Sequence, residues 1–329
     1  MHSHVPLTPV TFLERSAKAF PKKNALVYAE GVINFSELLQ RTRSLAQVLA
    51  RFEVAHGDRV AVLAENSIQT IEAHFAIPGA GAVLVMLNPW LSESDIVDLL
   101  DFSEAKVLIA DAVLYQKLSG AHRERLEQVL RVLVIHRPGD ILDARALDYE
   151  TSLKEQDGGV SLERCVDSEL DPIAINFTSG TTGRPKGVIY SHRAGYLHTL
   201  GQVLMVGLNK QSKYLWTLPM FHVNGWGHMW ACVAAGCTQV IPAANFSQER
   251  AGEFLSMVRE REITHLAGAP PSYQDVIRCH RSRKNAPRRN DHDGWIRPIP
   301  CLNSAAGRNG CKPHPSIRVE RNLWPVRGL

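Results

Sequence analysis

The residues best suited to chemistry form one glycine-rich stretch, TSGTTGRPKG, from Thr178 to Gly187. Its glycines let consecutive N–H groups curl around an anion, and its hydroxyl side chains add donors. Lys186 adds a positive charge, although it follows Pro185 and so does not fit the pattern GxxxxGK[ST]. The stretch comes after PIAINF, which is typical of a short buried strand. We predict a polyphosphate-binding loop; the alternative is a flexible surface turn.

The second candidate is PMFHVNGW, which places His222 between an apolar strand end and the start of a Gly-containing helix. A lone His is more often a core residue than a functional one. Trp226 and Trp230, four residues apart, fit either a pocket wall or a core stripe of one helix. His192 directly follows Ser191, and we expect it at a helix N-terminus without a chemical role.

Alternating strand and helix patterns must position these residues. RVAVLAEN, AVLVML and KVLIAD read as buried strands, separated by helices that begin near Ser67 and Ser92. This alternation predicts an α/β fold with parallel strands covered by helices. The polar stretch 148–171 reads as a linker, so we expect a first subdomain at 1–170 and a second at 171–278.

Composition excludes several classes of protein. The chain has 329 residues, 45% hydrophobic and 21% charged, which is ordinary for a globular protein. There is no secretory signal pattern and no apolar run near the roughly 18 residues that span a bilayer, so the cytoplasm is the expected compartment. The six Cys lack paired CxxC spacing and predict neither a disulfide framework nor a metal site.

Between about Thr11 and Tyr273 the sequence resembles the adenylate-forming acyl-CoA synthetases, also called AMP-dependent synthetases and ligases. The resemblance rests on FTSGTTGRPKGV, FSELLQR, GDRVAVLAENS, LNPWL, GVIYSHR, PMFHVNGW and THLAGAP. One departure is Trp90, where relatives often carry Arg. The fold implied is two layered βαβ-type subdomains of the large N-terminal domain of such an enzyme, incomplete at the C-terminus.

The resemblance implies a two-step reaction in which a carboxylate attacks the α-phosphate of ATP and coenzyme A then displaces AMP. ATP, Mg²⁺ and coenzyme A are the implied cofactors and co-substrates, and a small carboxylic acid, fatty or aromatic, is the implied substrate. His222 and Lys186 are the implied catalytic residues. The implied phosphate-binding residues are Thr178, Ser179, Gly180, Thr181, Thr182, Gly183 and Lys186. The implied acyl-pocket residues are His222, Asn224, Gly225, Trp226, Gly268, Ala269 and Pro270.

The segment after Arg278 breaks the pattern, because the family's adenine-binding GGS-A-P turn and YGLTETYGP-like block do not appear. If the reading frame is shifted by one base, permitted codons for 293–302 read Thr-Gly-Gly-Ser-Ala-Pro-Ser-Pro-Ala-Leu and those for 317–325 read Tyr-Gly-Leu-Ser-Glu-Thr-Tyr-Gly-Pro. We therefore interpret 279–329 as an aberrant, disordered tail translated out of frame. The chain is then a truncated ligase that alone forms little or no acyl-adenylate.

The sequence is also compatible with other functions. From Arg278 onward, twelve Lys and Arg face three acids, a pattern that sometimes marks nucleic-acid binding. The basic residues lack aromatic interleaving, so we expect no nucleic-acid partner. A catalytically silent nucleotide- or nucleic-acid-binding protein is one alternative, and an adenylating enzyme with a non-CoA acceptor is another. The oligomeric state is not predicted.

Overall fold

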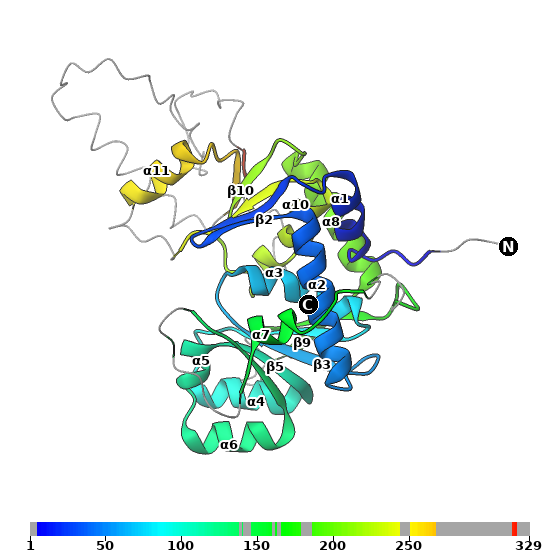
Figure 1. Cartoon of the computed structure of the whole chain (residues 1–329), viewed down its shortest axis with the longest axis vertical. Coiled ribbons are helices and arrows are strands. Elements are labelled where there is room, and N and C mark those ends of the chain that lie inside the picture. Colours follow the sequence, from blue (N-terminus) through cyan, green and yellow to red (C-terminus); the bar gives the residue numbers. More distant parts are fainter. Residues whose placement is uncertain are drawn as a thin grey trace, which may run out of the picture.

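The computed structural model describes residues 5–137, 140, 146–159, 162, 166–178, 186–243, 251–267 and 318–320. Within these ranges the chain is an α/β fold with two sheets, as the sequence predicts, and Figure 1 shows them one above the other. The strands are β1 (Asn24–Tyr28), β2 (Gly31–Asn34), β3 (Arg59–Leu63), β4 (Val83–Met86), β5 (Ala105–Asp111), β6 (Arg131–Ile135), β7 (Leu147–Asp148), β8 (Pro172–Thr178), β9 (Lys186–Ser191), β10 (Lys213–Leu215), β11 (Thr238–Val240), β12 (His265–Ala267) and β13 (Arg318–Glu320). The helices are α1 (Thr11–Ala19), α2 (Phe35–Arg51), α3 (Ile68–Gly79), α4 (Glu93–Ser103), α5 (Ala112–Gln116), α6 (Gly120–Val129), α7 (Tyr149–Lys154), α8 (His192–Val206), α9 (Val223–Trp226), α10 (His228–Ala234) and α11 (Ala251–Glu260).

The seven-stranded sheet has the order β7-β6-β5-β3-β4-β8-β9. Its strands pair in parallel except β9, which runs antiparallel to β8 at the edge. Both faces are covered: Val60 and Val62 of β3 face one core cluster, whereas Ala61 and Leu63 face another. A strand buried on both faces reads as a continuous apolar run, which explains the RVAVL pattern.

The six-stranded sheet, β13-β12-β10-β11-β1-β2, joins distant parts of the chain. β1 pairs in parallel with β11, with Leu26 opposite Gln239, and β2 folds back on β1. The division between the sheets therefore does not coincide with the expected boundary at residue 170. The N-terminal hairpin β1–β2 belongs with strands after residue 213, while β8 and β9 belong with the earlier strands.

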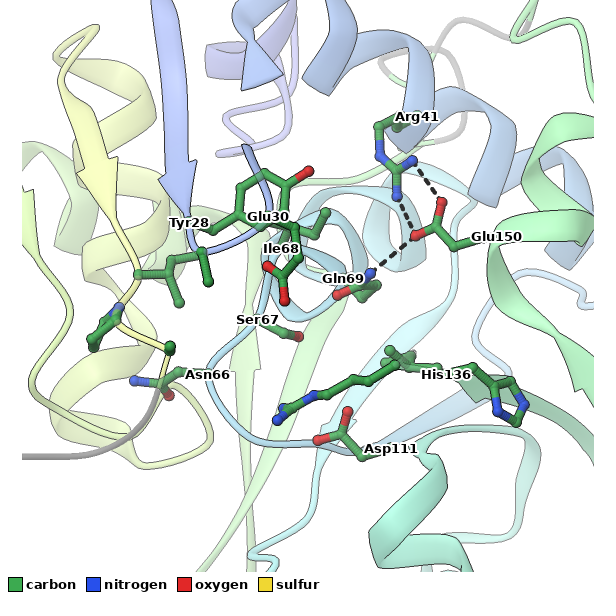
Figure 2. Close-up of a pocket in the computed structure, with 16 residues that line it drawn as sticks. Tyr28, Glu30, Arg41, Asn66, Ser67, Ile68, Gln69, Asp111, His136 and Glu150 are labelled. Atoms are coloured by element: carbon green, nitrogen blue, oxygen red, sulfur yellow. Dashed lines mark hydrogen bonds and ion pairs between the residues drawn. The ribbon is translucent and has the colours of Figure 1, made fainter. Parts of the chain in front are cut away.

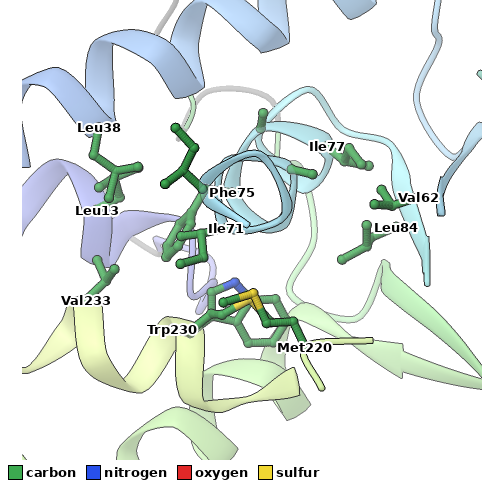
Figure 3. Close-up of a cluster of buried hydrophobic side chains, with 14 of the residues drawn as sticks. Leu13, Leu38, Val62, Ile71, Phe75, Ile77, Leu84, Met220, Trp230 and Val233 are labelled. Atoms are coloured by element: carbon green, nitrogen blue, oxygen red, sulfur yellow. The ribbon is translucent and has the colours of Figure 1, made fainter. Parts of the chain in front are cut away.

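Buried side chains define five layers of structure. The largest cluster lies between the sheets, where α1, α2, α3, α8 and α10 pack, and Figure 3 shows Phe75 of α3 and Trp230 of α10 within it. A second cluster packs α4, α5 and α6 on the outer face of the seven-stranded sheet. A third packs α11, through Phe254, on the outer face of the other sheet.

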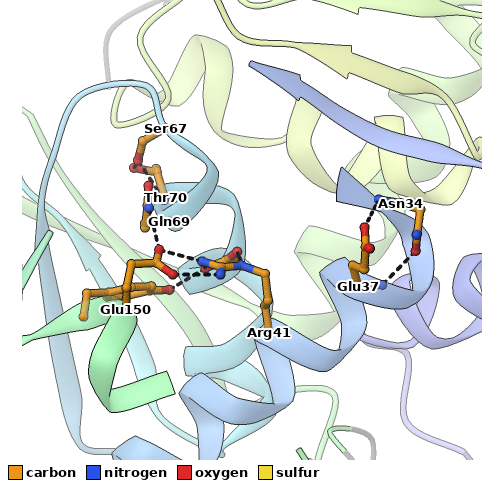
Figure 4. Close-up of polar contacts among 9 residues, drawn as sticks. Asn34, Glu37, Arg41, Ser67, Gln69, Thr70 and Glu150 are labelled. Carbon is orange, nitrogen blue, oxygen red and sulfur yellow. Dashed lines mark hydrogen bonds and ion pairs between the residues drawn. The ribbon is translucent and has the colours of Figure 1, made fainter. Parts of the chain in front are cut away.

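Side-chain caps begin most of the helices that carry or support the site. Ser67 accepts a hydrogen bond from the Thr70 N–H at the start of α3, and Ser191 accepts one from the Ala194 N–H at the start of α8. Both starts are as predicted, and His192 is indeed the first residue of α8. The start of α2 is a reciprocal capping box between Asn34 and Glu37 (Figure 4).

The stretch 148–171 is not a simple surface linker. Its described residues include α7, and Tyr149, Leu153 and Leu162 are buried in the central cluster. Tyr149 also donates a hydrogen bond to Glu72 at 2.7 Å. The polar composition misled the prediction, because three spaced apolar residues are enough to bury this segment against α2 and α3.

The tail expected at 279–329 lies outside the described residues except for β13. Arg318–Glu320 pair in parallel with His265–Ala267, so these three residues form a strand rather than a disordered segment.

Candidate functional site

A cavity of about 300 Å³ opens where the carboxyl ends of strands from both sheets meet (Figure 2). In the seven-stranded sheet the chain leaves β3 toward β4 on one side and leaves β5 toward β6 on the other. Such a reversal of direction, a topological switch point, is the usual ligand-binding crevice of parallel sheets. The cavity lies there, between the residues that follow β3 and β5. Its lining is Tyr28, Ala29, Glu30, Arg41, Asn66, Ser67, Ile68, Gln69, Asp111, Ile135, His136, Arg137, Glu150, Ile241, Pro242 and Ala243.

One wall of the cavity is a tightly paired charge cluster. Arg41 donates to Glu72 at 2.5 Å and to both carboxylate oxygens of Glu150 at 2.8 Å, as Figures 2 and 4 show in part. Burial raises the pKa of the fully buried Glu72. Burial also acts to raise the pKa of Glu150, but the hydrogen bonds and charge of Arg41 hold it below its ordinary value. These charges satisfy one another, so the cluster joins α2, α3 and α7 rather than offering a free charge to a ligand.

The opposite wall of the cavity carries a carboxylate that can accept a further hydrogen bond. Asp111 is 5% exposed, and its Oδ2 accepts a hydrogen bond from the Glu65 N–H at 2.8 Å. Its Oδ1 has no hydrogen-bond partner within the described part of the chain. Burial raises the pKa of Asp111, because the charged form is poorly solvated there.

The predicted phosphate loop is the connection between β8 and β9. Thr178 and Lys186 are direct cross-strand partners at its two ends, and both are exposed. Ser179, Gly180, Thr181, Thr182 and Gly183 lie outside the described residues, so their predicted role stays a prediction. Close to the mouth of this hairpin, Asn176 is 6% exposed and its amide has no partner among the described residues. A hydroxyl, an ammonium and an unpaired amide at one hairpin fit a phosphate-bearing nucleotide.

His222 lies in the loop that follows β10, at the carboxyl edge of the six-stranded sheet. Its N–H donates to the Pro219 carbonyl at 3.2 Å, and its own carbonyl accepts from the N–H groups of Gly225 and Trp226. The side chain is exposed, and partial burial lowers the pKa of the ring below its ordinary value. The imidazole is therefore neutral near neutral pH, with one nitrogen able to donate and one able to accept.

Two of the predicted acyl-pocket residues, Gly225 and Trp226, have described surroundings on the helix after His222, and their role in a pocket stays a prediction. Gly225 has a steric reason to be glycine, since a Cβ there would lie 2.5 Å from the Pro219 carbonyl oxygen. Asn224 lies on α9, and its side chain is outside the description. Trp226 is 2% exposed and stands edge-on to the ring of Trp230 at 4.6 Å, so the two tryptophans form a core stripe. Gly268, Ala269 and Pro270 lie outside the described residues.

An aromatic contact brings the two predicted regions together. Tyr190, on the strand that begins at Lys186, packs against Trp226, with the two rings tilted by 36° and their centroids 4.7 Å apart. The strand that leaves the phosphate loop and the helix that follows His222 are therefore neighbours, although the strand belongs to the seven-stranded sheet and the helix follows a strand of the six-stranded sheet.

The sequence pattern did not reveal that Asn66 and Trp90 support the segment around His222. Asn66 hydrogen-bonds the loop before His222. Trp90 packs edge-on against Phe221, with ring centroids 5.0 Å apart. The available signal was position, because both follow the carboxyl end of a buried strand, where parallel sheets place functional side chains.

The described residues lack two kinds of feature. No group of three or more His, Cys, Asp or Glu there is arranged to hold a metal ion. No described helix is long and apolar enough to cross a membrane.

Comparison with known proteins gives consistent matches. The sequence profile described as AMP-binding enzyme matches residues 13–309, which extends past Tyr273, where the motif resemblance ends. The trans-cinnamate:CoA ligase, peroxisomal, of Petunia hybrida is 35% identical over 290 residues, covering 84% of this chain and 50% of that protein. The butyrate–CoA ligase AAE11, peroxisomal, of Arabidopsis thaliana is 31% identical over 298 residues, covering 87% of this chain and 51% of that protein. The chain thus spans about half the length of the curated relatives it matches.

Solved structures match the fold. The anthranilate CoA ligase AuaEII, in complex with anthranoyl-AMP, has a TM-score of 0.74 at 23% identity, covering 83% of this chain and 51% of that one. The o-succinylbenzoate coenzyme A synthetase of Bacillus subtilis, in complex with ATP and magnesium ion, has a TM-score of 0.66 at 23% identity, covering 81% of this chain and 51% of that one.

The ligases of Petunia hybrida and Arabidopsis thaliana described above are both named peroxisomal, so the expected cytoplasmic location of this chain stays a prediction.

Proposed function

This chain belongs to the AMP-binding enzyme family, and we propose that it serves the ATP-dependent activation of a carboxylic acid through an acyl-adenylate to an acyl-CoA thioester. The observation that carries the proposal is the contact of Tyr190 with Trp226, which joins the hairpin of Thr178 and Lys186 to the helix after His222. A phosphate-binding element and a neutral imidazole then serve one reaction centre, which an acyl-adenylate requires.

The described residues have distinct roles in this proposal. Lys186 and Thr178 bind the β- and γ-phosphates of ATP from the two sides of the hairpin, since an ammonium and a hydroxyl both donate to phosphate oxygens. His222, neutral because partial burial lowers its pKa, hydrogen-bonds the acid's carboxylate and orients it toward the α-phosphate. Magnesium, when bound with ATP, neutralises phosphate charge.

The acid substrate is a small fatty or aromatic acid. The curated relatives are named for trans-cinnamate and butyrate, which share a carboxylate on a short apolar body. Coenzyme A as the acceptor rests on the same names.

The test begins with nucleotide binding, because the chain spans about half of its relatives. Isothermal titration with ATP and MgCl₂ should show binding that Lys186→Ala weakens about tenfold or more, the effect of removing one charge-assisted hydrogen bond. Lys210→Ala, at an exposed turn before β10, removes the same charge and should leave affinity unchanged. Equal affinity of the two variants contradicts the assignment of Lys186.

Formation of the acyl-adenylate is tested separately by pyrophosphate exchange with trans-cinnamate or butyrate. The sequence predicts little or no exchange by this chain alone, and exchange at an ordinary enzyme rate would overturn that prediction while supporting the function. ATP binding without exchange in a chain extended to the length of its relatives would favour a catalytically silent nucleotide-binding protein.

A further inference from the structure

Asn66 joins the two sheets at the loop that carries His222. It lies between β3 and α3, and its side-chain Nδ2 donates to the Leu218 carbonyl at 2.8 Å. The Met220 N–H donates to its Oδ1 at 2.7 Å. One amide side chain therefore satisfies a backbone acceptor and a backbone donor two residues apart, across more than 150 residues of sequence.

The loop needs such a partner because it is buried. Leu218 is 7% exposed and Met220 is 1% exposed, so their backbone groups cannot turn to water. Met220 and Trp230 both belong to the central cluster (Figure 3). A buried backbone group without a partner costs about 1–3 kcal/mol, which makes the two bonds of Asn66 decisive for the loop's position.

The position of His222 follows from that of Met220. Only Phe221 separates them in the chain, and the His222 N–H closes a turn onto Pro219, between the two residues that Asn66 holds. Phe221 is in turn held by the edge of the Trp90 ring. Asn66 follows β3 and Trp90 follows β4, so both contacts come from the sheet that also carries the hairpin of Thr178 and Lys186.

We propose that Asn66 is a positioning residue, which holds His222 at a fixed place relative to the phosphate-binding hairpin through its two hydrogen bonds to the loop. This rests on the proposed function for the role of His222, but the geometry is independent of it. Only a side chain with one donor and one acceptor in the same plane satisfies both partners. Asp in place of Asn66 would set a carboxylate oxygen against the Leu218 carbonyl, and Leu would leave both backbone groups unpaired.

The first experiment is amide hydrogen exchange in the whole chain, resolved at Met220. Asn66→Leu should speed exchange at Met220 about tenfold or more, the effect of losing one buried hydrogen bond. The matched control is Ser16→Ala, which removes a buried side-chain bond from Ser16 Oγ to the Val233 carbonyl at 2.6 Å, away from the site. Ser16→Ala should lower the melting temperature without a local effect at Met220.

The second experiment follows the His222 ring by NMR during a pH titration, with His222→Gln used to assign its signals. In Asn66→Leu the lowered pKa of His222 should move toward its ordinary value, because a released loop exposes the ring; in Ser16→Ala it should not move. If Asn66→Leu fails to fold, Asn66→Asp is measured instead, since it keeps the acceptor for Met220. In folded Asn66→Leu, an unchanged exchange rate at Met220 together with an unchanged His222 titration overturns the proposal; in Asn66→Asp, an unchanged His222 titration does so.

A third measurement separates this proposal from the proposed function. In any form of the enzyme that exchanges pyrophosphate with trans-cinnamate, Asn66→Asp should lower kcat with little change in the KM for ATP, because the hairpin itself is intact. Failure of a chain extended to the length of its relatives to exchange under any condition counts against the proposed function. The exchange and titration results at Met220 and His222 still decide whether Asn66 positions the loop.

Discussion

Acid should destabilise this fold through His74, a neutral histidine at the centre of the molecule. Its ring lies in α3 between the two sheets and is fully buried. Nδ1 donates to the Thr70 carbonyl at 2.7 Å, whereas Nε2 has no partner among the described residues. Burial lowers the pKa of His74 from 6.5 to about 4, because a charged imidazolium would be poorly solvated there.

The sign and size of the effect follow from proton linkage. Above the ordinary pKa of the His74 ring, 6.5, the ring is neutral in both the folded and the unfolded state, so protonation of His74 takes nothing from the free energy of unfolding. Between 6.5 and about 4 only the unfolded state binds it, and the free energy of unfolding falls by about 1.36 kcal/mol per pH unit. The total loss from this one residue is about 3 kcal/mol, reached near the folded-state pKa.

The assay is urea unfolding of the wild type and His74→Gln at several values between about pH 7 and pH 5. His192, whose pKa burial also lowers to about 4, adds the same slope to both proteins, as do all other groups. The difference between the two proteins therefore isolates one proton. The wild type should lose about 2 kcal/mol relative to His74→Gln between pH 6.5 and about pH 5. Parallel curves would refute the reasoning, because they would mean that the ring at position 74 takes up no extra proton on unfolding.

Three further predictions concern the supports of the site and the tail. Gly225→Ala should cost about 1–3 kcal/mol in chemical unfolding, since its Cβ meets the Pro219 carbonyl, whereas Gly201→Ala in α8, with open space around it, should be neutral or slightly stabilising. Arg41→Gln should cost about 3–5 kcal/mol by stranding the buried Glu72, and Arg51→Gln, which breaks an exposed ion pair with Glu155, should cost less than about 1 kcal/mol; equal losses would contradict the assigned burial effect. Sequencing the DNA around codons 275–330 should show the GGS-A-P and YGLTETYGP-like blocks in the frame shifted by one base, and their absence from that frame removes the frameshift hypothesis.

The sequence predicted the features that depend on local patterns. Ser67 and Ser191 start helices because their hydroxyls accept from backbone N–H groups three residues on, a signal confined to a few neighbouring residues. The strands β3 and β4 were also predictable, because a continuous run of apolar residues is typical of a parallel strand that is buried on both faces. The family was also recognisable from the stretch around Thr178, whose glycine and hydroxyl spacing is distinctive.

Features that depend on partners far along the chain were not predictable in this way. Nothing local in Asn24–Tyr28 shows that it pairs with Thr238–Val240, so the boundary at residue 170 did not match the sheets. Asn66 likewise looks like an ordinary loop residue until Leu218 and Met220 lie beside it. In both cases the deciding contact forms only after the tertiary structure is complete.

The pairing of β1 with β11 also has a consequence for biosynthesis. Leu26 meets Gln239, so the β1–β2 hairpin must wait for more than 200 further residues to leave the ribosome before its sheet can form. At about 5–20 residues per second, this wait lasts on the order of 10–40 s. The seven-stranded sheet, built mainly from the continuous stretch between Arg59 and Ser191, can assemble earlier. The nascent chain therefore exposes the edge of β1 that faces away from β2 for many seconds, which makes the β1–β2 hairpin the natural place for a chaperone to bind during translation.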